Sequence, residues 1–204
     1  LMESIEGKKG MPRNKPPFPA QSGIYGRPTT INNTETIASV PTIIRNGADW
    51  FLELGKPNNG GVKIFSVSGH VEKPGNFEVP LGTPFRDLLE MAGGVWKGRR
   101  LKAVIPGGSS MPMIPGEQMM DLTMDYDALM GAGSALGSGG VVVMDETTDM
   151  GRALLCISRF YYAGFTRATG APRISSCWIR RRARSPGIPS APSARPPPGP
   201  CKEC

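Results

Sequence analysis

A sharp change in composition near residue 150 limits which part of this chain can fold. Residues 1–150 contain 14 Lys and Arg against 16 Asp and Glu, whereas residues 151–204 contain 10 against 1. The formal net charge of +7 therefore comes from the C-terminal part. Because the apolar residues are concentrated between Ile37 and Tyr162, a hydrophobic core can form only in that stretch.

The middle of the chain has the alternating pattern of β-strands. Phe65 and Val67 alternate with polar residues along one predicted strand. Pro74-Gly75 predicts a type II turn, because proline and glycine suit its two central positions, and Phe77 and Val79 then resume the alternation. The pattern predicts a β-hairpin.

A short helix and two further strands follow this hairpin. Thr83 is the predicted N-cap of the helix, and Gly93-Gly94 ends it. Apolar runs at 101–105 and 140–144 predict the strands. The order strand, strand, helix, strand and strand predicts an α+β fold of the β-grasp, or ubiquitin-like, type over residues 62–147.

The flanking segments have other patterns. Within residues 1–61, residues 7–30 are dense in Lys, Pro and Gly and are predicted to be extended. A helix is predicted to begin near Asn33 and to stop at Asn46-Gly47, since apolar residues follow Asn33 at helical spacing.

The C-terminal part is predicted to begin with an amphipathic helix over residues 148–163. Its apolar stripe consists of Met150, Leu154, Ile157 and Tyr161. Residues 164–204 are rich in Arg and Pro and show no periodicity, so they are predicted to be disordered.

The cysteines and the apolar runs restrict the setting of the chain. All four cysteines lie in the last third: Cys156, Cys177, Cys201 and Cys204. A core without cysteine fits a reducing cytosol, and Cys201-x-x-Cys204 without a second pair does not predict a zinc site. No apolar run approaches the roughly 20 residues of a membrane-spanning helix, so we expect a protein that is soluble or peripheral to a membrane.

Three features suggest chemistry without establishing it. The glycine-rich loops at 106–110 and 131–140 can bind phosphates or can be plain connections, and the second loop lacks the order of a dinucleotide-binding loop. His70, the one histidine, has no adjacent nucleophile and supporting acid, so we interpret it as a strand-face residue. The arginine tract at 180–184 can bind nucleic acid, but few aromatic residues accompany it.

The most informative polar pair is Asn32-Asn33, where a loop meets the predicted helix. Their amides can donate to and accept from a polar ring or a phosphate, and a helix N-terminus adds positive potential. The pattern alone favours an N-cap.

Several unbroken motifs resemble the flavoprotein, NADH-binding subunit of respiratory complex I, NADH:quinone oxidoreductase. The resemblance covers about residues 1–162. The motifs are Glu6-Gly7-Lys8-Lys9-Gly10, Pro16-Pro17-Phe18-Pro19-Ala20, Pro28-Thr29-Thr30-Ile31-Asn32-Asn33-Thr34-Glu35-Thr36, Gly69-His70-Val71 and Leu136-Gly137-Ser138-Gly139.

The resemblance implies a subunit that oxidises NADH by hydride transfer to FMN and passes single electrons to a [4Fe-4S] cluster, toward quinone. It implies that Asn32 and Asn33, with Thr36 as a weaker neighbour, contact FMN. Residues 62–147 would be the soluble-ligand-binding β-grasp (SLBB) domain, residues 1–61 the end of the FMN- and NADH-binding α/β domain, and residues 148–163 the first helix of the iron-sulfur domain.

The resemblance also implies partners and a location. The partners are the thioredoxin-like [2Fe-2S] subunit and the large iron-sulfur subunit. The location is the cytoplasmic face of an energy-transducing membrane, or the matrix face in mitochondria, with the protein peripheral to the membrane and no nucleic acid bound.

The chain also departs from this family. The glycine-rich loop for FMN and NADH is absent, and after Tyr162 the expected Ser-Cys-Gly-x-Cys-x-Pro-Cys motif is replaced by Gly164-Phe165-Thr166-Arg167. We therefore expect a partial chain whose tail is translated out of frame, with no catalytic residue, no metal ligand, no stably held cofactor and no activity alone. A stand-alone β-grasp ligand-binding or partner-binding module and a basic-tailed nucleic-acid binder are the alternatives.

Overall fold

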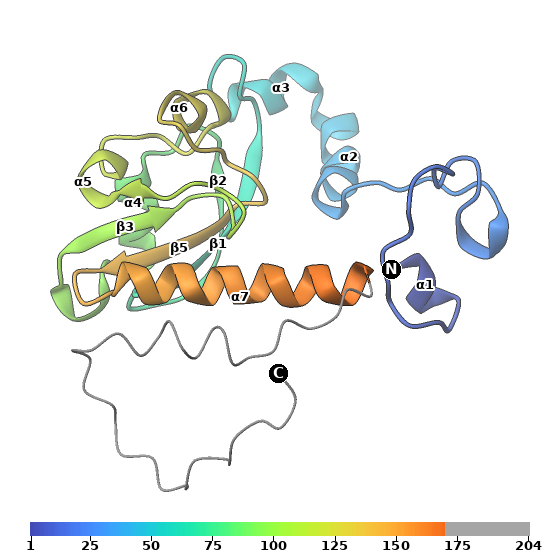
Figure 1. Cartoon of the computed structure of the whole chain (residues 1–204). Coiled ribbons are helices and arrows are strands. Elements are labelled where there is room, and N and C mark those ends of the chain that lie inside the picture. Colours follow the sequence, from blue (N-terminus) through green and yellow to red (C-terminus); the bar gives the residue numbers. More distant parts are fainter. Residues whose placement is uncertain (170–204) are drawn as a thin grey trace, which may run out of the picture. The chain divides into compact units, whose positions relative to one another are not determined.

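A five-stranded mixed sheet with the strand order β2-β1-β5-β3-β4 organises the described part of the chain, residues 1–169 of a computed structural model (Figure 1). β1 pairs antiparallel with β2 and parallel with β5, and β3 pairs antiparallel with β5 and β4. The strands are β1 (Val62–Gly69), β2 (Gly75–Pro80), β3 (Leu101–Ile105), β4 (Ile114–Pro115) and β5 (Gly140–Asp145).

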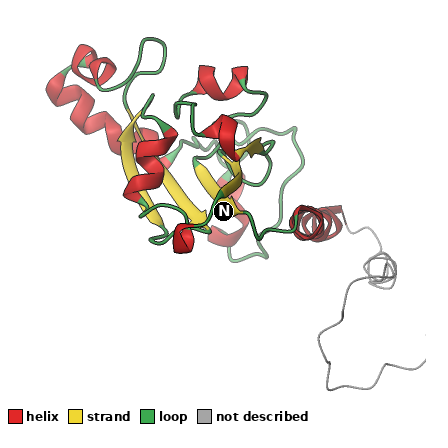
Figure 2. Cartoon of the chain, turned by 90° about the vertical axis from the view of Figure 1, so that its left-hand side faces the viewer, coloured by secondary structure: helices red, strands yellow, loops and turns green. Residues whose placement is uncertain are grey.

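Helices precede, connect and follow these strands. They are α1 (Met2–Ile5), α2 (Thr34–Asn46), α3 (Ala48–Glu53), α4 (Phe85–Met91), α5 (Gly116–Met119), α6 (Tyr126–Gly131) and α7 (Met150–Thr169), with the 3₁₀ turns η1 (Ile24–Gly26) and η2 (Trp96–Gly98). The strands lie between helices in both views (Figure 1 and Figure 2). Of the described residues, 1–159 form one compact unit and 160–169 belong to a second.

The main core lies between one face of the sheet and the helices α4, α5 and α6. Phe65 and Val67 of β1 are buried there, as the alternation in the sequence predicts. They meet Phe85, Leu88, Met119 and Leu129 from the three helices. Each such side chain contributes about 1.5–3 kcal/mol when it is removed from water, so this layer supplies most of the favourable burial.

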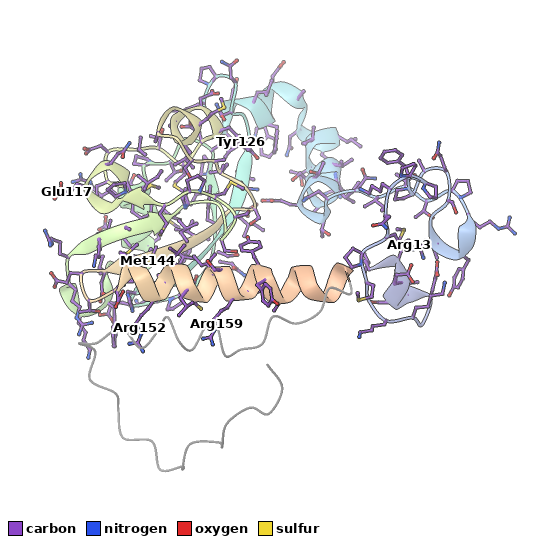
Figure 3. The ribbon with its side chains drawn as sticks, viewed as in Figure 1. Arg13, Glu117, Tyr126, Met144, Arg152 and Arg159 are labelled. Carbon is purple, nitrogen blue, oxygen red and sulfur yellow. The ribbon has the colours of Figure 1, made fainter. Side chains whose placement is uncertain are left out.

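The opposite face of the sheet carries a second, smaller cluster. Ala103, Ile105 and Met144 are buried there, and the first turns of α7 pack on them through Met150, Ala153 and Ile157. Figure 3 shows Met144 beside α7, whereas Arg152 and Arg159 point away from the sheet. Helix α7 is therefore amphipathic.

The predicted stripe and end of α7 differ from the structure. Leu154 is 60% exposed, and Ala153 takes the inner position because the contact with Met144 sets the rotation of the helix. The helix continues to Thr169, so residues 164–169 are helical although the sequence predicts disorder there. Residues 170–204, the rest of the predicted disordered tail, lie outside the described residues.

Two local predictions were wrong. Gly75 does not have the positive φ of a type II turn, because it already pairs with Val67 at the start of β2. Thr83 does not cap α4: its hydroxyl donates to the carbonyl of Pro80 at 2.7 Å, and Pro84 occupies the N-cap position.

Ionic contacts hold together the extended segment near the N-terminus. Arg13, labelled in Figure 3, bonds to Glu3, to Glu6 at 2.7 Å and to the carbonyl of Gly23 at 2.9 Å. Hydrogen bonds from Lys8 and Arg13 lower the pKa of Glu6 to about 2. This polar network organises a segment whose prolines prevent regular structure.

The core position of Phe65 gives a stability prediction. Phe65→Ala should lower the free energy of unfolding by about 3–5 kcal/mol, because Phe65 is fully buried and its removal leaves a cavity. Urea unfolding followed by circular dichroism measures this change. Phe65→Leu should lose less, and the control Phe160→Ala, at a side chain 68% exposed, should change stability by less than about 0.5 kcal/mol.

Candidate functional site

The predicted cofactor residues lie at the N-terminus of α2. Asn33 is the N-cap, as its pattern predicts: its Oδ1 accepts hydrogen bonds from the backbone N–H of Glu35 at 2.9 Å and of Thr36 at 3.2 Å. The cap brings Asn33 and Thr36 together. Asn32 precedes the cap, and all three side chains are exposed.

This helix end can bind a polar or anionic group. Because Oδ1 of Asn33 faces the helix, its Nδ2 amide is left to donate elsewhere. The Asn32 amide, the Thr36 hydroxyl and the positive end of the helix dipole add to this set. Donors of this kind are of the type that fits a phosphate or the polar edge of a flavin.

The two glycine-rich loops are paired with each other. Gly108 N donates to Gly140 O at 2.6 Å, and Ser138 N donates to Gly107 O at 3.1 Å. A Cβ atom on Gly107 would collide with the carbonyl oxygen of Ala135. The glycines therefore permit a close approach of backbones, and these amides do not face a ligand.

His70 has a polar environment that sequence reasoning missed. Its Nδ1 lies 3.2 Å from the backbone nitrogen of Asp145 and 3.2 Å from Oδ1 of the same residue. The ring stacks on Trp96, with the ring centroids 6.3 Å apart. A separation of 75 residues between His70 and Asp145 leaves no local signal, so only the pairing of β1 with β5 could have indicated this contact.

Asp145 is a structural carboxylate. It is fully buried, and the Thr147 hydroxyl donates to it at 2.6 Å, while Arg99 pairs with it at 3.0 Å. The hydrogen bond from Thr147, helped by Arg99, lowers the pKa of Asp145 to about 2. Asp145, His70 and Arg99 therefore brace the end of β5, where the chain turns toward α7.

A second polar cluster, in which Asn59 and Asp125 are buried, joins the segment after α3 to α6. Lys56 Nζ donates to Asp125 at 3.0 Å, and Asn59 Nδ2 donates to Asp127 at 2.6 Å. Burial alone would raise the pKa of Asp125, but hydrogen bonds from Thr123, Ala128 and Lys56 together lower it. The polar atoms of this cluster bond to one another, which indicates a structural role for the cluster.

Comparisons with known proteins agree with the motifs. The SLBB domain family matches residues 64–114, which lie inside the predicted β-grasp segment. The NADH-quinone oxidoreductase F subunit of Rickettsia bellii is 58% identical over 163 residues, and that of Rickettsia typhi is 57% identical over the same length. The chain is homologous to part of this NADH-quinone oxidoreductase subunit. The resemblance predicted from the motifs is thereby confirmed.

The match covers unequal shares of the proteins. It includes 79% of this chain but 39% of the length of the R. bellii protein and 38% of the R. typhi protein. Two crystal structures of NAD⁺-reducing [NiFe]-hydrogenase are also similar. The H₂-reduced state has a TM-score of 0.66 at 35% identity and covers 80% of this chain but 27% of the hydrogenase chain. The air-oxidised state has a TM-score of 0.65 at 31% identity and covers 89% of this chain but 30% of the hydrogenase chain.

The described residues do not fit an iron-sulfur cluster of the kind that the resemblance implies. Among residues 1–169 no three His, Cys, Asp or Glu side chains are grouped as metal ligands, and Cys156 is an exposed free thiol. Cys177, Cys201 and Cys204 lie outside the described residues.

Within residues 1–169, no helix is both long enough and apolar enough to cross a membrane.

The Asn33 cap can be tested locally, because α2 has no buried residue and its fraying need not change global stability. Asn33→Ala should cost about 1 kcal/mol of helix stability and speed amide exchange at Glu35 and Thr36 by about fivefold. Hydrogen exchange followed by NMR measures this change. Asn33→Asp should stay near wild type, and Asn46→Ala at the other helix end should not affect these amides.

The lowered pKa of Asp145 should make the free energy of unfolding depend on pH. Its folded pKa of about 2 lies below the ordinary 3.8, so the ionised form stabilises the fold above about pH 4, and this stability is lost as the pH falls toward 2. Asp145→Asn should be less stable at pH 7 and lose less stability on acidification, as measured by urea unfolding at several pH values.

Two comparisons sharpen the Asp145 test. Glu6, whose pKa is also about 2, keeps its own contribution, so the acid loss should be reduced and not abolished. Asp121→Asn, at a side chain 84% exposed, should follow wild type. An acid loss as steep in Asp145→Asn as in wild type would contradict the assignment.

Proposed function

We propose that this chain supplies the FMN-contacting end of α2 and the SLBB domain of an NADH-oxidising flavoprotein subunit of NADH-quinone oxidoreductase. The observation that carries the proposal is the 58% identity to the R. bellii protein over 163 residues. The geometry agrees, because the three residues assigned to FMN are exposed at one helix N-terminus. The intact protein would oxidise NADH by hydride transfer and send electrons toward quinone.

Each residue at this site would have a separate task. Asn33 would hold the helix end with Oδ1 and donate to the cofactor with Nδ2, Asn32 would add a second amide, and Thr36 would add a hydroxyl. FMN, when bound, supplies the conversion of a two-electron hydride into single electrons. The residues of this chain would orient the cofactor by hydrogen bonds, and the positive end of the helix dipole would stabilise its negative charge.

The fold supports a structural role for the SLBB domain. A central parallel pair, β1 and β5, flanked by antiparallel strands in the order β2-β1-β5-β3-β4 supports the finer assignment to the β-grasp fold. Its glycine-rich loops bond to each other, so they give no support to a stand-alone ligand-binding module. The arginine tract of the nucleic-acid alternative lies outside the described residues.

The protein would act within a larger assembly. A chain that spans 39% of its relative lacks counterparts for most of that protein, so we propose that this chain alone is inactive and does not hold FMN, NAD or a [4Fe-4S] cluster stably. Its partners would be the thioredoxin-like [2Fe-2S] subunit and the large iron-sulfur subunit. The assembly would lie on the cytoplasmic or matrix face of an energy-transducing membrane.

Titration of the whole chain with FMN tests this proposal. Weak binding should shift the NMR signals of Asn32, Asn33 and Thr36, and Asn32→Ala should weaken binding about tenfold, the size expected for one lost hydrogen bond to a charged group. Asn32→Ala leaves the cap intact. Asn46→Ala is the matched control, with the same residue type at the opposite end of α2, and should leave affinity unchanged.

Riboflavin, which lacks the phosphate, is the control ligand. Comparing its binding with that of FMN separates the contribution of the phosphate from that of the ring. If FMN shifts no signal at the start of α2, or if Asn32→Ala binds as well as wild type, the FMN assignment is wrong.

A further inference from the structure

Glu35 connects the candidate cofactor site to the sheet. It lies in the first turn of α2, and its Oε1 accepts a hydrogen bond from the backbone N–H of Ile64 at 2.7 Å. Its Oε2 accepts from Lys63 Nζ at 3.3 Å. Both partners are in β1, so one carboxylate bonds to two consecutive residues of the strand.

The N–H of Ile64 needs a partner because β5 begins too late to provide one. The pairing of β1 with β5 starts at Ser66 and Gly140, and Ser66 N donates to Gly139 O at 2.9 Å. Every second N–H of a strand points to the same side, so the N–H of Ile64 points beyond the start of β5. Glu35 therefore supplies the acceptor that β5 would supply if it began earlier in the chain.

Lys63 approaches Glu35 across Gly139. A Cβ atom on Gly139 would lie 3.2 Å from Cε of Lys63 and 2.8 Å from the carbonyl oxygen of Ile64, and the φ of Gly139 is +76°. Glycine therefore leaves room for the lysine stem. The motifs Asn32-Asn33-Thr34-Glu35-Thr36 and Leu136-Gly137-Ser138-Gly139 thus meet at residues 63 and 64.

The polar contact is important because α2 is not held by deep packing. None of its residues is buried. A groove of about 380 Å³ lies between the two helices and the strands, lined by Glu35, Ser39 and Thr42 of α2, by Trp50 and Phe51 of α3, and by Val62 and Ile64 of β1. Apolar contacts alone therefore do not fix the start of α2 on the sheet.

We propose that Glu35 is a positioning residue that holds the N-terminus of α2 on β1 and has its charge neutralised there by Lys63. The proposal rests on the proposed function in one respect: the positioned end carries Asn32, Asn33 and Thr36. A free carboxylate beside these donors would repel an anionic cofactor. The pairing with Lys63 removes that repulsion while Glu35 still holds the helix.

Amide exchange of the whole chain tests the positioning directly. Glu35→Ala should speed exchange of the Ile64 N–H by about tenfold or more, because its acceptor is lost, while the Ser66 N–H, bonded to Gly139, should not change. Glu35→Gln keeps an oxygen acceptor and should be intermediate. Glu78→Ala is the matched control, since Glu78 is an exposed carboxylate that pairs opposite Ile64 in the sheet. Unchanged Ile64 exchange in Glu35→Ala overturns the proposal.

FMN binding tests the charge neutralisation. Lys63→Met should weaken FMN binding several-fold, since the Glu35 carboxylate then lacks its lysine partner near the site, and the double variant E35Q/K63M should restore it. A purely structural role would leave the double variant as weak as Lys63→Met, which would overturn the neutralisation. If FMN shifts no signal at α2 in wild type, the proposed function fails, and the Ile64 exchange alone still decides whether Glu35 positions the helix.

Discussion

The parallel pairing of β1 with β5 is the constraint on which the rest of the structure depends. It joins Ser66–Gly69 to Gly140–Val143. Because the two strands run parallel, the chain between them must return from the C-terminal end of β1 to the N-terminal end of β5. The connection between them contains β2, α4, η2, β3, β4, α5 and α6, and its three α-helices cover one face of the sheet. The main core is a consequence of this connection.

The same pairing places the polar residues that brace the ends of the sheet. At one end it brings His70 within 3.2 Å of Asp145, and Asp145 holds Arg99 and the turn before α7. At the other end, the late start of β5 leaves the N–H of Ile64 to Glu35. Strand register therefore determines how α7 leaves the sheet and how α2 is attached to it.

Local patterns predicted much of the fold, whereas contacts between distant residues could not be predicted. The strand Leu101–Ile105 and the cap at Asn33 agree with the sequence because both depend on residues close together in the chain. Leu154 was assigned to the wrong side of α7, since the contact with Met144 sets the rotation of the helix. The pairs Glu35 and Ile64, His70 and Asp145, and Lys56 and Asp125 are 29, 75 and 69 residues apart, and each depends on the folded arrangement. The candidate cofactor residues came from the resemblance to the complex I flavoprotein, because the pattern around them alone favoured only a helix cap.

Capping and cofactor binding are compatible roles for Asn33. The two N–H groups of Glu35 and Thr36 require an oxygen, so the amide must turn Oδ1 toward the helix. Nδ2 then has to face away, in a direction that the cap itself fixes. An amide held in this way loses little rotational freedom when it donates to a ligand, which lowers the cost of binding. Glu35, bonded to β1, fixes the position of that helix end, so the direction of the Asn33 donor depends on the sheet as well as on the helix.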